Sequence, residues 1–316
     1  MRKPTHDPSR RSALKGLLVS GAALALARWP LPALAADDAP ILRAIPSTGV
    51  RIPIVGLGTN AYGVATAEER APLREVIARL AQVQGSVIDT APGYRNSEEV
   101  LGELIAELGV RDRLFLATKV TAPGDDLAEA LRQLENSFRL LKTDRIDLMQ
   151  VHNLNGAEAV LPTLAQWKRD GRFGHIGITT SSNDQHARTA ELIRQHALDF
   201  VQVNYSLGNR AAEETVLPAA LERGTAVLLN IPLGGRRGSL FGKVKDVPLP
   251  AWAADFDAHS WGQLFLKYSL SHPAVTAVIP GTTKVANLED NLGAGRGRLP
   301  DAATRKRIEE LWDSLG

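Results

Sequence analysis

Short apolar segments alternate with longer amphipathic segments along most of the chain. Eight apolar segments have the length and the flanking residues of buried strands, and they cover residues 54–59, 86–90, 114–120, 147–152, 175–180, 200–204, 226–231 and 275–280. Between them, apolar residues recur at helical spacing, for example at Leu73, Val76, Ile77 and Leu80. We therefore predict helices over residues 67–84, 98–108, 127–141, 157–169, 185–195, 211–223, 259–271, 285–292 and 302–315.

The order of these elements predicts an α/β protein with a (β/α)8 TIM barrel. Strands that are separated by helices cannot pair as hairpins, so they form a parallel sheet with right-handed crossovers. Eight strand–helix units in one domain favour a closed barrel over an open doubly wound sheet. An open dinucleotide-binding sheet would also need G-x-G-x-x-G after its first strand, and "GLGTNAYG" lacks that spacing. A β-hairpin that turns at Ser47-Thr48-Gly49 is expected before the first strand.

The first 35 residues have the pattern of a targeting segment. A basic start is followed by an apolar stretch from Leu17 to Ala27 and by an A-x-A site at residues 33–35. The apolar stretch is too short to span a bilayer. The sequence "SRRSALK" resembles a twin-arginine export signal, and an ordinary secretory signal is the alternative. We expect the export machinery for folded proteins to recognise residues 1–35, which are then removed. The remaining residues 36–316 should form the barrel, without a membrane anchor, in the periplasm.

Composition excludes several classes of protein. The 316 residues include 37 Lys and Arg against 35 Asp and Glu, and no basic block is interleaved with aromatic residues. We therefore expect no nucleic-acid partner. The chain has no cysteine, which excludes disulfides, thiolate metal sites and a cysteine nucleophile. The seven histidines show no metal-ligand spacing, so no metal site is predicted.

Polar residues at the strand ends supply the candidate chemistry, because active sites of such barrels lie at the carboxyl ends of the strands. Asp89, Lys119 and His152 end the second, third and fourth strands, and Tyr94 follows Asp89 by one short loop. A phenol has a reference pKa of about 10, and a neighbouring cation favours its ionised form. A buried lysine needs a carboxylate partner, which Asp89 can supply. The set describes a proton donor assisted by a Lys–Asp pair, with a histidine that orients a carbonyl group.

The mature chain resembles the aldo-keto reductases. The segments that carry the resemblance are "VIDTAPGYRNSEEVLG", "LFLATKV", "IDLMQVHN", "GHIGITT", "VQVNYS", "PLGGRRG" and "VIPGTTKVANLEDNL". The resemblance implies that Asp89, Tyr94, Lys119 and His152 are the catalytic residues and that the hairpin closes the floor of the barrel. It further implies reduction of a small-molecule aldehyde or ketone by hydride transfer from NADPH, with Tyr94 as the proton donor.

The nicotinamide site departs from the family pattern. The family commonly holds the carboxamide with Ser-Asn at the end of the fifth strand, where this chain has Thr179-Thr180, while the third contact, Gln202, is present. A tyrosine often stacks on the nicotinamide from the seventh strand, where Asn230 stands here. We therefore expect weaker nicotinamide binding.

The adenosine side leaves the choice of cofactor open. Asn287 stands where many NADPH enzymes have an arginine, which is the better phosphate partner. Lys284 and Thr282 could take its place, and Asn291 would contact the adenine. The basic residues after the seventh strand could cover the pyrophosphate or belong to a solvated loop; they are Arg236, Arg237 and Lys243. Thr59 and Leu233 are further predicted cofactor contacts. NADP(H) is favoured as the cofactor, and NAD(H) stays an alternative.

The loops predict an open substrate site, and we expect the protein to be a monomer. The chain ends directly after its last helix, and the loop "NLNGAEA" after His152 is short. With Tyr62 as an aromatic wall, such a site favours broad carbonyl specificity. A nucleotide-binding sensory module on a reductase scaffold, with little turnover, is the alternative function. A barrel hydrolase would need paired carboxylates at the strand ends, and only Asp89 qualifies.

Overall fold

The computed structural model describes residues 39–235 and 238–315, and its main sheet has eight parallel strands. Neighbouring strands follow one another in sequence from β3 to β10. The strands are β3 Leu57–Gly58, β4 Ser86–Asp89, β5 Leu114–Val120, β6 Ile146–Val151, β7 Phe173–Thr179, β8 Phe200–Asn204, β9 Ala226–Asn230 and β10 Val275–Val278. The expected barrel of parallel strands is confirmed.

The first and last strands close the barrel through short contacts. Single bridges join Val55 to Val278 and Gly58 to Gly281. Glycine permits this approach, because a Cβ atom on Gly58 would lie 2.8 Å from the carbonyl oxygen of Ile279. The predicted strand 54–59 therefore contributes only β3 and two isolated bridges.

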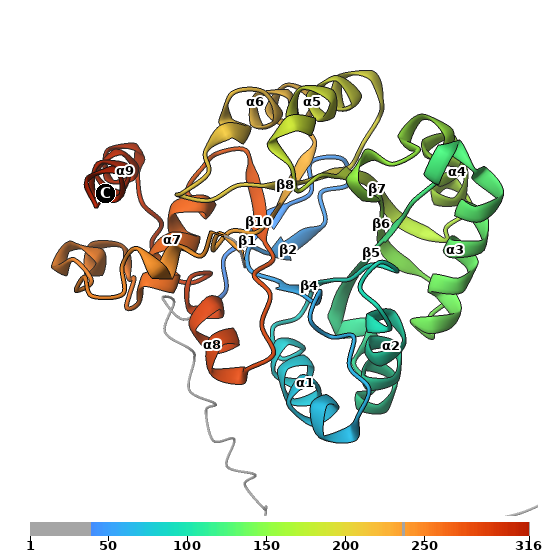
Figure 1. Ribbon diagram of the computed structural model, residues 1–316, viewed down its shortest axis with the longest axis horizontal. Coiled ribbons are helices and arrows are strands. Elements are labelled where there is room, and N and C mark those ends of the chain that lie inside the picture. Colours follow the sequence, from blue (N-terminus) through green and yellow to red (C-terminus); the bar gives the residue numbers. More distant parts are fainter. Residues whose placement is uncertain (1–38, 236–237, 316) are drawn as a thin grey trace, which may run out of the picture. The chain divides into compact units, whose positions relative to one another are not determined.

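A ring of helices surrounds the strands (Figure 1). The α-helices are α1 Ala67–Leu80, α2 Ser97–Leu108, α3 Leu127–Leu140, α4 Ala157–Arg169, α5 His186–Gln195, α6 Val216–Arg223, α7 Trp261–Leu270, α8 Val285–Gly293 and α9 Ala302–Ser314. Short 3-10 helices are η2 Arg111–Arg113, η3 Pro123–Asp125, η4 His152–Leu154, η5 Asn183–Gln185, η6 Ala211–Glu213, η7 Leu240–Gly242 and η8 Ala251–Phe256. All nine predicted helices are present among the described residues. The predicted helix 211–223 is divided into η6 and α6, with Pro218 in the first turn of α6, where a missing N–H is tolerated.

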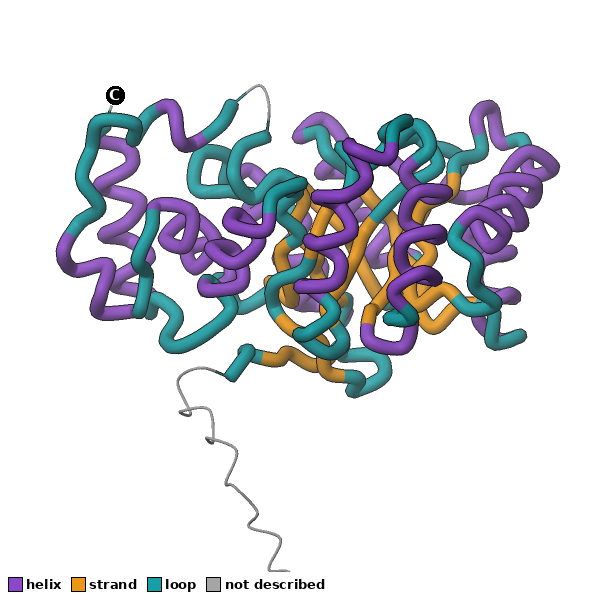
Figure 2. The backbone as a smooth tube through the Cα atoms, turned by 90° about the horizontal axis from the view of Figure 1, so that it is seen from below, coloured by secondary structure: helices purple, strands orange, loops and turns teal. Residues whose placement is uncertain are grey.

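An N-terminal hairpin closes one end of the barrel (Figure 2). Strands β1 Leu42–Ala44 and β2 Arg51–Pro53 pair antiparallel, and Gly49 has a positive φ of 73° in their turn. Ile45 and Ile52 are buried against the side chains that fill the barrel, among them Val87, Phe115 and Phe200. The barrel is thus a packed core with a closed floor, and chemistry can take place only at the other end.

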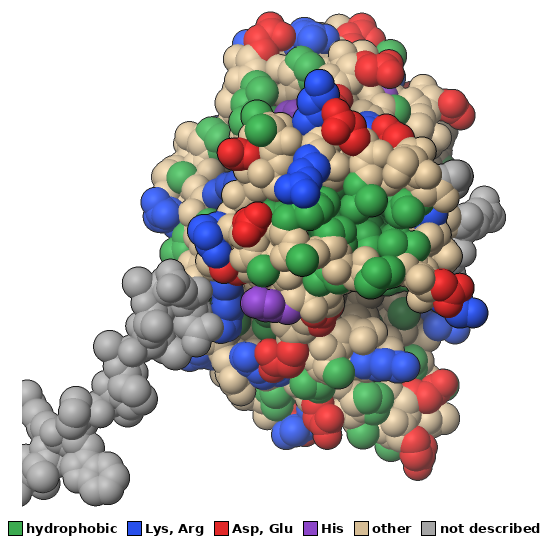
Figure 3. All heavy atoms as spheres, turned by 90° about the vertical axis from the view of Figure 1, so that its left-hand side faces the viewer, with side chains coloured by type: hydrophobic (Ala, Val, Ile, Leu, Met, Phe, Trp, Pro, Cys, Tyr) green, Lys and Arg blue, Asp and Glu red, His purple; other side chains and the backbone are tan. Residues whose placement is uncertain are grey.

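The outer surface carries a hydrophobic area (Figure 3). No helix among the described residues is long and apolar enough to cross a membrane. The face on the side of α9 and of the segment between β9 and α7 carries a central hydrophobic area among mixed charges (Figure 3).

Candidate active site

Three of the predicted catalytic side chains meet in one hydrogen-bonded group. Alternate residues of β5 point into the barrel, which takes Lys119 inward after Phe115 and Ala117. Its ammonium donates to Asp89 Oδ2 (2.6 Å), to the carbonyl oxygen of Thr90 (2.7 Å) and to the hydroxyl of Tyr94 (3.2 Å). Lys119 is only 1% exposed, so all three donors of the ammonium are used inside the protein.

The charge of Lys119 is maintained by its partners. Burial by itself lowers the pKa of this lysine, but the carboxylate of Asp89 and the phenol of Tyr94 outweigh burial and raise it. The ammonium therefore stays protonated at neutral pH and lies 4.8 Å from the centre of the Tyr94 ring. A cation in this position stabilises negative charge on the phenol oxygen.

Two glutamines hold the other oxygen of Asp89. The side-chain amides of Gln150 and Gln202 donate to Oδ1 over 3.1 and 2.9 Å. Gln150 pairs with Lys119 across β5 and β6, which places both in one layer of the barrel. The sequence reasoning missed Gln150, although a glutamine within the apolar run "IDLMQV" is a recognisable signal of a buried polar role.

His152 completes the set at the end of β6. Its ring meets the ring of Tyr94 edge to face, with centres 5.9 Å apart. Burial and the nearby charge of Lys119 lower the pKa of His152 to about 4. The imidazole is therefore neutral at physiological pH, and it can donate one N–H hydrogen bond without carrying charge.

Tyr94 and His152 open into a cavity of about 890 Å³. Asp89 also reaches its wall, whereas Lys119 lies beneath it. Five of the predicted cofactor contacts line the cavity: Thr179, Gln202, Leu233, Lys284 and Asn287. Further polar lining residues that the sequence reasoning did not single out are Asn60, Asn153, Ser181, Ser239 and Thr283. Each except Ser239 follows closely after the end of a strand or bridge of the barrel, so the strand-end rule could have found them.

The profile of the Aldo/keto reductase family matches residues 54–313, which includes every strand of the barrel and the four residues described above. This chain belongs to the aldo/keto reductase family.

Individual aldo-keto reductases support the assignment. The chain is 33% identical over 219 residues to aldo-keto reductase YhdN of Bacillus subtilis, and the match spans 64% of each protein. It is 30% identical over 254 residues to methylglyoxal reductase YeaE of Escherichia coli, spanning 78% of this chain and 86% of that protein. The crystal structure of an aldo/keto reductase from Klebsiella pneumoniae in complex with NADP and acetate has the same fold, with a TM-score of 0.64, 24% identity and coverage of 85% and 94%.

Three predicted cofactor contacts of this aldo-keto reductase do not line the cavity. Thr59 is buried, and its hydroxyl donates to the carbonyl oxygen of Asp89 (2.8 Å). The hydroxyl of Thr180 is turned to Gln185 (2.6 Å). Asn291 is buried within α8. The hydroxyls of Thr59 and Thr180 thus hold the segments around the strand ends together.

Tyr62 is not the wall of an open substrate site, and that expectation was wrong. The side chain is fully buried, and its hydroxyl donates to the carbonyl oxygen of Thr282 (3.1 Å). Burial raises the pKa of this phenol, which therefore stays protonated. Tyr62 anchors the segment after β10, which carries Lys284.

The basic residues after β9 do not form one site on the described part of the chain. Arg236 and Arg237 lie outside the described residues. Lys243 does not line the 890 Å³ cavity; its ammonium lies 4.5 Å above the ring of Trp312, on the wall of a second cavity.

Asn230 stands at the end of β9, where the family often has a tyrosine. Its amide nitrogen donates to the carbonyl oxygen of Thr180 (2.9 Å) and to Oε1 of Gln202 (3.3 Å). Its Oδ1 atom has no hydrogen-bond partner among the described residues. Asn230 at the end of β9 and Gln202 in β8 form a polar wall, which suits an amide group in a ligand.

No group of three or more His, Asp or Glu side chains that could hold a metal ion occurs within residues 39–235 and 238–315. The site of this aldo-keto reductase is thus built from one ion pair, one phenol, one neutral imidazole and amides.

Proposed function

We propose that this protein reduces aldehyde or ketone carbonyls, with NADPH as the hydride donor and Tyr94 as the proton donor. The proposal rests on two hydrogen bonds of the Lys119 ammonium, one to Asp89 and one to the Tyr94 hydroxyl. Tyr94 and His152 both line the large cavity. The family supports the reaction class.

The roles of the four side chains follow from their contacts. Tyr94 gives its phenolic proton to the carbonyl oxygen as that oxygen gains charge. Lys119 stabilises the phenolate that remains, and Asp89 keeps Lys119 charged and in place. His152, being neutral, donates a hydrogen bond to the same carbonyl oxygen and orients it without repelling the ammonium.

The residues of the cavity suit a nicotinamide dinucleotide. Thr179, Gln202 and Asn230 present hydroxyl and amide groups to the carboxamide, and the unpartnered Oδ1 of Asn230 is a fitting acceptor for its N–H. Lys284 and Asn287, at the start of α8, would hold the 2′-phosphate at the other end. When bound, NADPH supplies the hydride to the carbonyl carbon. NADP(H) is favoured, since a lysine lines this end and the Klebsiella pneumoniae structure of this fold was solved with NADP. NAD(H) is the alternative.

The decisive experiment separates binding from turnover. Purified protein is titrated with NADPH by fluorescence, and oxidation of NADPH is then followed with methylglyoxal, the substrate in the name of the Escherichia coli relative, and with nitrobenzaldehyde. We expect Tyr94→Phe to bind NADPH within a few-fold of wild type and to lose about 10²–10⁴-fold in kcat, the usual contribution of a general acid. Tyr268→Phe, which removes a phenol that does not line the cavity, should keep its activity.

The same experiment tests the sensory alternative. Equally slow turnover by wild type and Tyr94→Phe, together with tight NADPH binding, would favour a nucleotide-sensing module. Absence of NADPH binding would contradict both functions. A panel of aldehydes in which one substrate exceeds all others would contradict the broad specificity expected from the short loops.

We further propose that residues 1–35 are a twin-arginine signal and that the protein acts in the periplasm. The proposal is supported by the sequence "SRRSALK" and by the A-x-A site at residues 33–35. Residues 1–35 all lie outside the described residues. Cell fractionation should find the wild-type protein, shortened, in the periplasmic fraction. The double change Arg10→Lys and Arg11→Lys should keep it in the cytoplasm at full length, and unchanged export would contradict the proposal.

A further inference from the structure

Two amide side chains line the cavity into which the proton donor Tyr94 opens. They are Asn60 and Asn153, and each stands two residues after the last residue of its strand, β3 or β6. Both side chains are exposed, and neither amide makes a hydrogen bond with another residue of the described chain. Each therefore offers an acceptor oxygen and two donor hydrogens to a molecule in the cavity.

The segment that carries Asn60 is fixed against the catalytic group. Thr59, the residue before it, donates its N–H to the carbonyl oxygen of Asp89 over 3.0 Å. Three residues after Asn60, a Cβ atom on Gly63 would lie only 2.7 Å from the carbonyl oxygen of Tyr94. This segment thus packs along the loop between β4 and α2, which carries the proton donor.

Asn153 is held in place by its own backbone. Its φ of 53° and ψ of 36° are left-handed values, which asparagine adopts more readily than most residues. Its N–H donates to the hydroxyl of Thr179 (3.4 Å), and its carbonyl oxygen accepts from the amide of Gln185 (3.1 Å). The backbone is thus fixed directly after His152, and only the side chain is left for a ligand.

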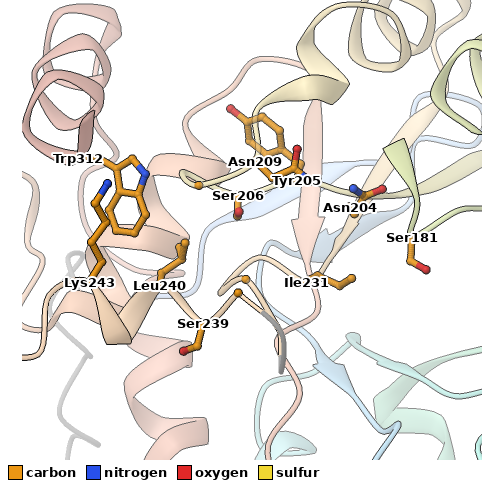
Figure 4. Close-up of a pocket in the computed structure, with 13 residues that line it drawn as sticks. Ser181, Asn204, Tyr205, Ser206, Asn209, Ile231, Ser239, Leu240, Lys243 and Trp312 are labelled. Carbon is orange, nitrogen blue, oxygen red and sulfur yellow. The ribbon is translucent and has the colours of Figure 1, made fainter. Parts of the chain in front are cut away.

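The cavity offers little to an aromatic substrate. Among the described lining residues, Tyr94 and His152 carry the only aromatic rings. The ring expected as a wall, that of Tyr62, is buried. An indole ring lies instead in the second cavity, of about 490 Å³, where Trp312 stands at the opposite end of the view from Ser181 (Figure 4). An aryl substrate therefore has no further ring to stack on beside the proton donor.

The charges of the wall favour a neutral substrate. Asp89 and Lys284 are the only charged side chains among the described lining residues. Asp89 is bound to Lys119, and Lys284 stands at the start of α8, where we place the 2′-phosphate of the cofactor. Neither is left to pair with a charged substrate, whereas a neutral hydroxyl or carbonyl group matches the free amides.

We propose that Asn60 and Asn153 are specificity-determining residues, which select short carbonyl compounds with a hydroxyl or a second carbonyl group on the neighbouring carbon. The inference rests on the proposed function and names the class of its substrate. The reacting carbonyl oxygen lies at Tyr94 and His152, and the neighbouring oxygen binds the two amides. The carbonyl carbon gains the hydride, its oxygen gains the Tyr94 proton, and a hydroxy ketone leaves as a vicinal diol.

The test compares substrates of equal size that differ in one group. Hydroxyacetone and butanone are both methyl ketones, and the hydroxyl of the first takes the place of a methyl in the second. Glycolaldehyde and propanal form the matching pair of aldehydes. With NADPH oxidation as the signal, we expect kcat/KM of the wild type to favour the hydroxylated member of each pair. Asn60→Leu and Asn153→Gly should each reduce that preference about 3–10-fold, the effect of one neutral hydrogen bond.

The variants have matched controls. Glycine is chosen at position 153 because it accepts a positive φ without strain. Asn155→Ala removes an exposed amide from the same loop that does not line the cavity, and it should keep the wild-type preference. Asn60→Ser keeps a hydrogen-bonding group and should retain more of the preference than Asn60→Leu. A wild type without the preference, or variants that keep it in full, would overturn the proposal and leave the reductase function intact.

Binding measurements separate this inference from the proposed function. NADPH affinity, measured by fluorescence, should be the same in wild type, Asn60→Leu and Asn153→Gly, and a large loss would make the amides cofactor ligands and overturn the proposal. If no carbonyl is reduced at all, the proposed function fails, and saturation-transfer NMR of the protein with NADPH then decides the site. Stronger transfer to hydroxyacetone than to butanone, lost in both variants, would support it, and equal transfer would refute it.

Discussion

At the scale of single residues, the site depends on one buried ion pair. Lys119 and Asp89 are both nearly inaccessible to water, and their bond of 2.6 Å is supported by amide donors on the other carboxylate oxygen. Desolvation makes such a pair expensive to form, so its two charges are tolerated only together. The chemistry at Tyr94 requires the cation, and the fold requires the anion that balances it.

We predict that Lys119→Met both inactivates and destabilises the protein. Loss of the cation leaves the Asp89 carboxylate buried without a counter-charge, which costs about 3–5 kcal/mol in the free energy of unfolding. Urea denaturation at pH 7 measures this. The double variant Asp89→Asn/Lys119→Met removes both charges and should regain much of the stability but no activity. A double variant no more stable than the single one would contradict this account.

The low pKa of His152 predicts a pH dependence of stability. The unfolded imidazole binds a proton near its usual value of 6.5, whereas the folded one does so only near 4. Between these values the unfolded state holds more protons, so stability falls as the pH falls from 6.5 to 4 and is unaffected above that range. His152→Gln should lose less unfolding free energy over this interval than wild type. His259→Gln, at an exposed position, should follow wild type.

At the scale of elements, α2 fixes the loop that carries Tyr94. The hydroxyl of Ser97, its first residue, donates to the carbonyl oxygen of Thr59 (3.1 Å) and meets the hydroxyl of Thr90 (3.0 Å). Asn96 donates to the carbonyl oxygen of Val64 (2.8 Å). These hydrogen bonds attach the helix to the ends of β3 and β4.

One turn further along α2, Gly102 lets the helix pack closely against the end of α3.

We predict that Gly102→Ala is destabilising, against the helix propensity of alanine. Propensity alone would stabilise an α-helix by about 0.5–1 kcal/mol. However, the new Cβ would lie 2.0 Å from the carbonyl oxygen of Leu140, so α2 must shift, at a cost of about 1–3 kcal/mol. The shift also moves Tyr94, so kcat should fall. Ala106→Gly on the exposed side of α2 should lose only the propensity difference. A Gly102→Ala variant more stable than wild type would refute the close contact.

At the scale of the whole molecule, one end of the barrel contributes to stability and the other end carries the active site. The hairpin β1–β2 and the large side chains of the strand starts fill the floor, whereas every residue of the proposed chemistry lies at the strand ends. This separation lets stability and catalysis be changed independently.

We predict that Ile45→Ala lowers stability with little effect on turnover. Ile45 is fully buried in the floor, and its truncation should cost about 2–5 kcal/mol in unfolding free energy. Because the cavity lies at the opposite end, kcat with a saturating aldehyde should change less than about threefold. Val50→Ala, on the exposed hairpin turn, should change stability by less than about 0.5 kcal/mol. A large fall in kcat for Ile45→Ala would show that the two ends are coupled.

The order of strands and helices, the barrel and the meeting of Asp89, Tyr94, Lys119 and His152 were all predictable from the amino-acid sequence. These follow from local patterns, because an apolar run with a polar end predicts both a strand and its position at the barrel opening. Contacts between distant segments, in contrast, are visible only in the folded chain. Gln150 and Gln202 bind Asp89, Tyr62 is buried although it was expected to form a wall of the substrate site, and Lys243 lies over Trp312 beside a second cavity. Such contacts arise from closure of the barrel and packing of α9 against it, and no local pattern in the sequence encodes them.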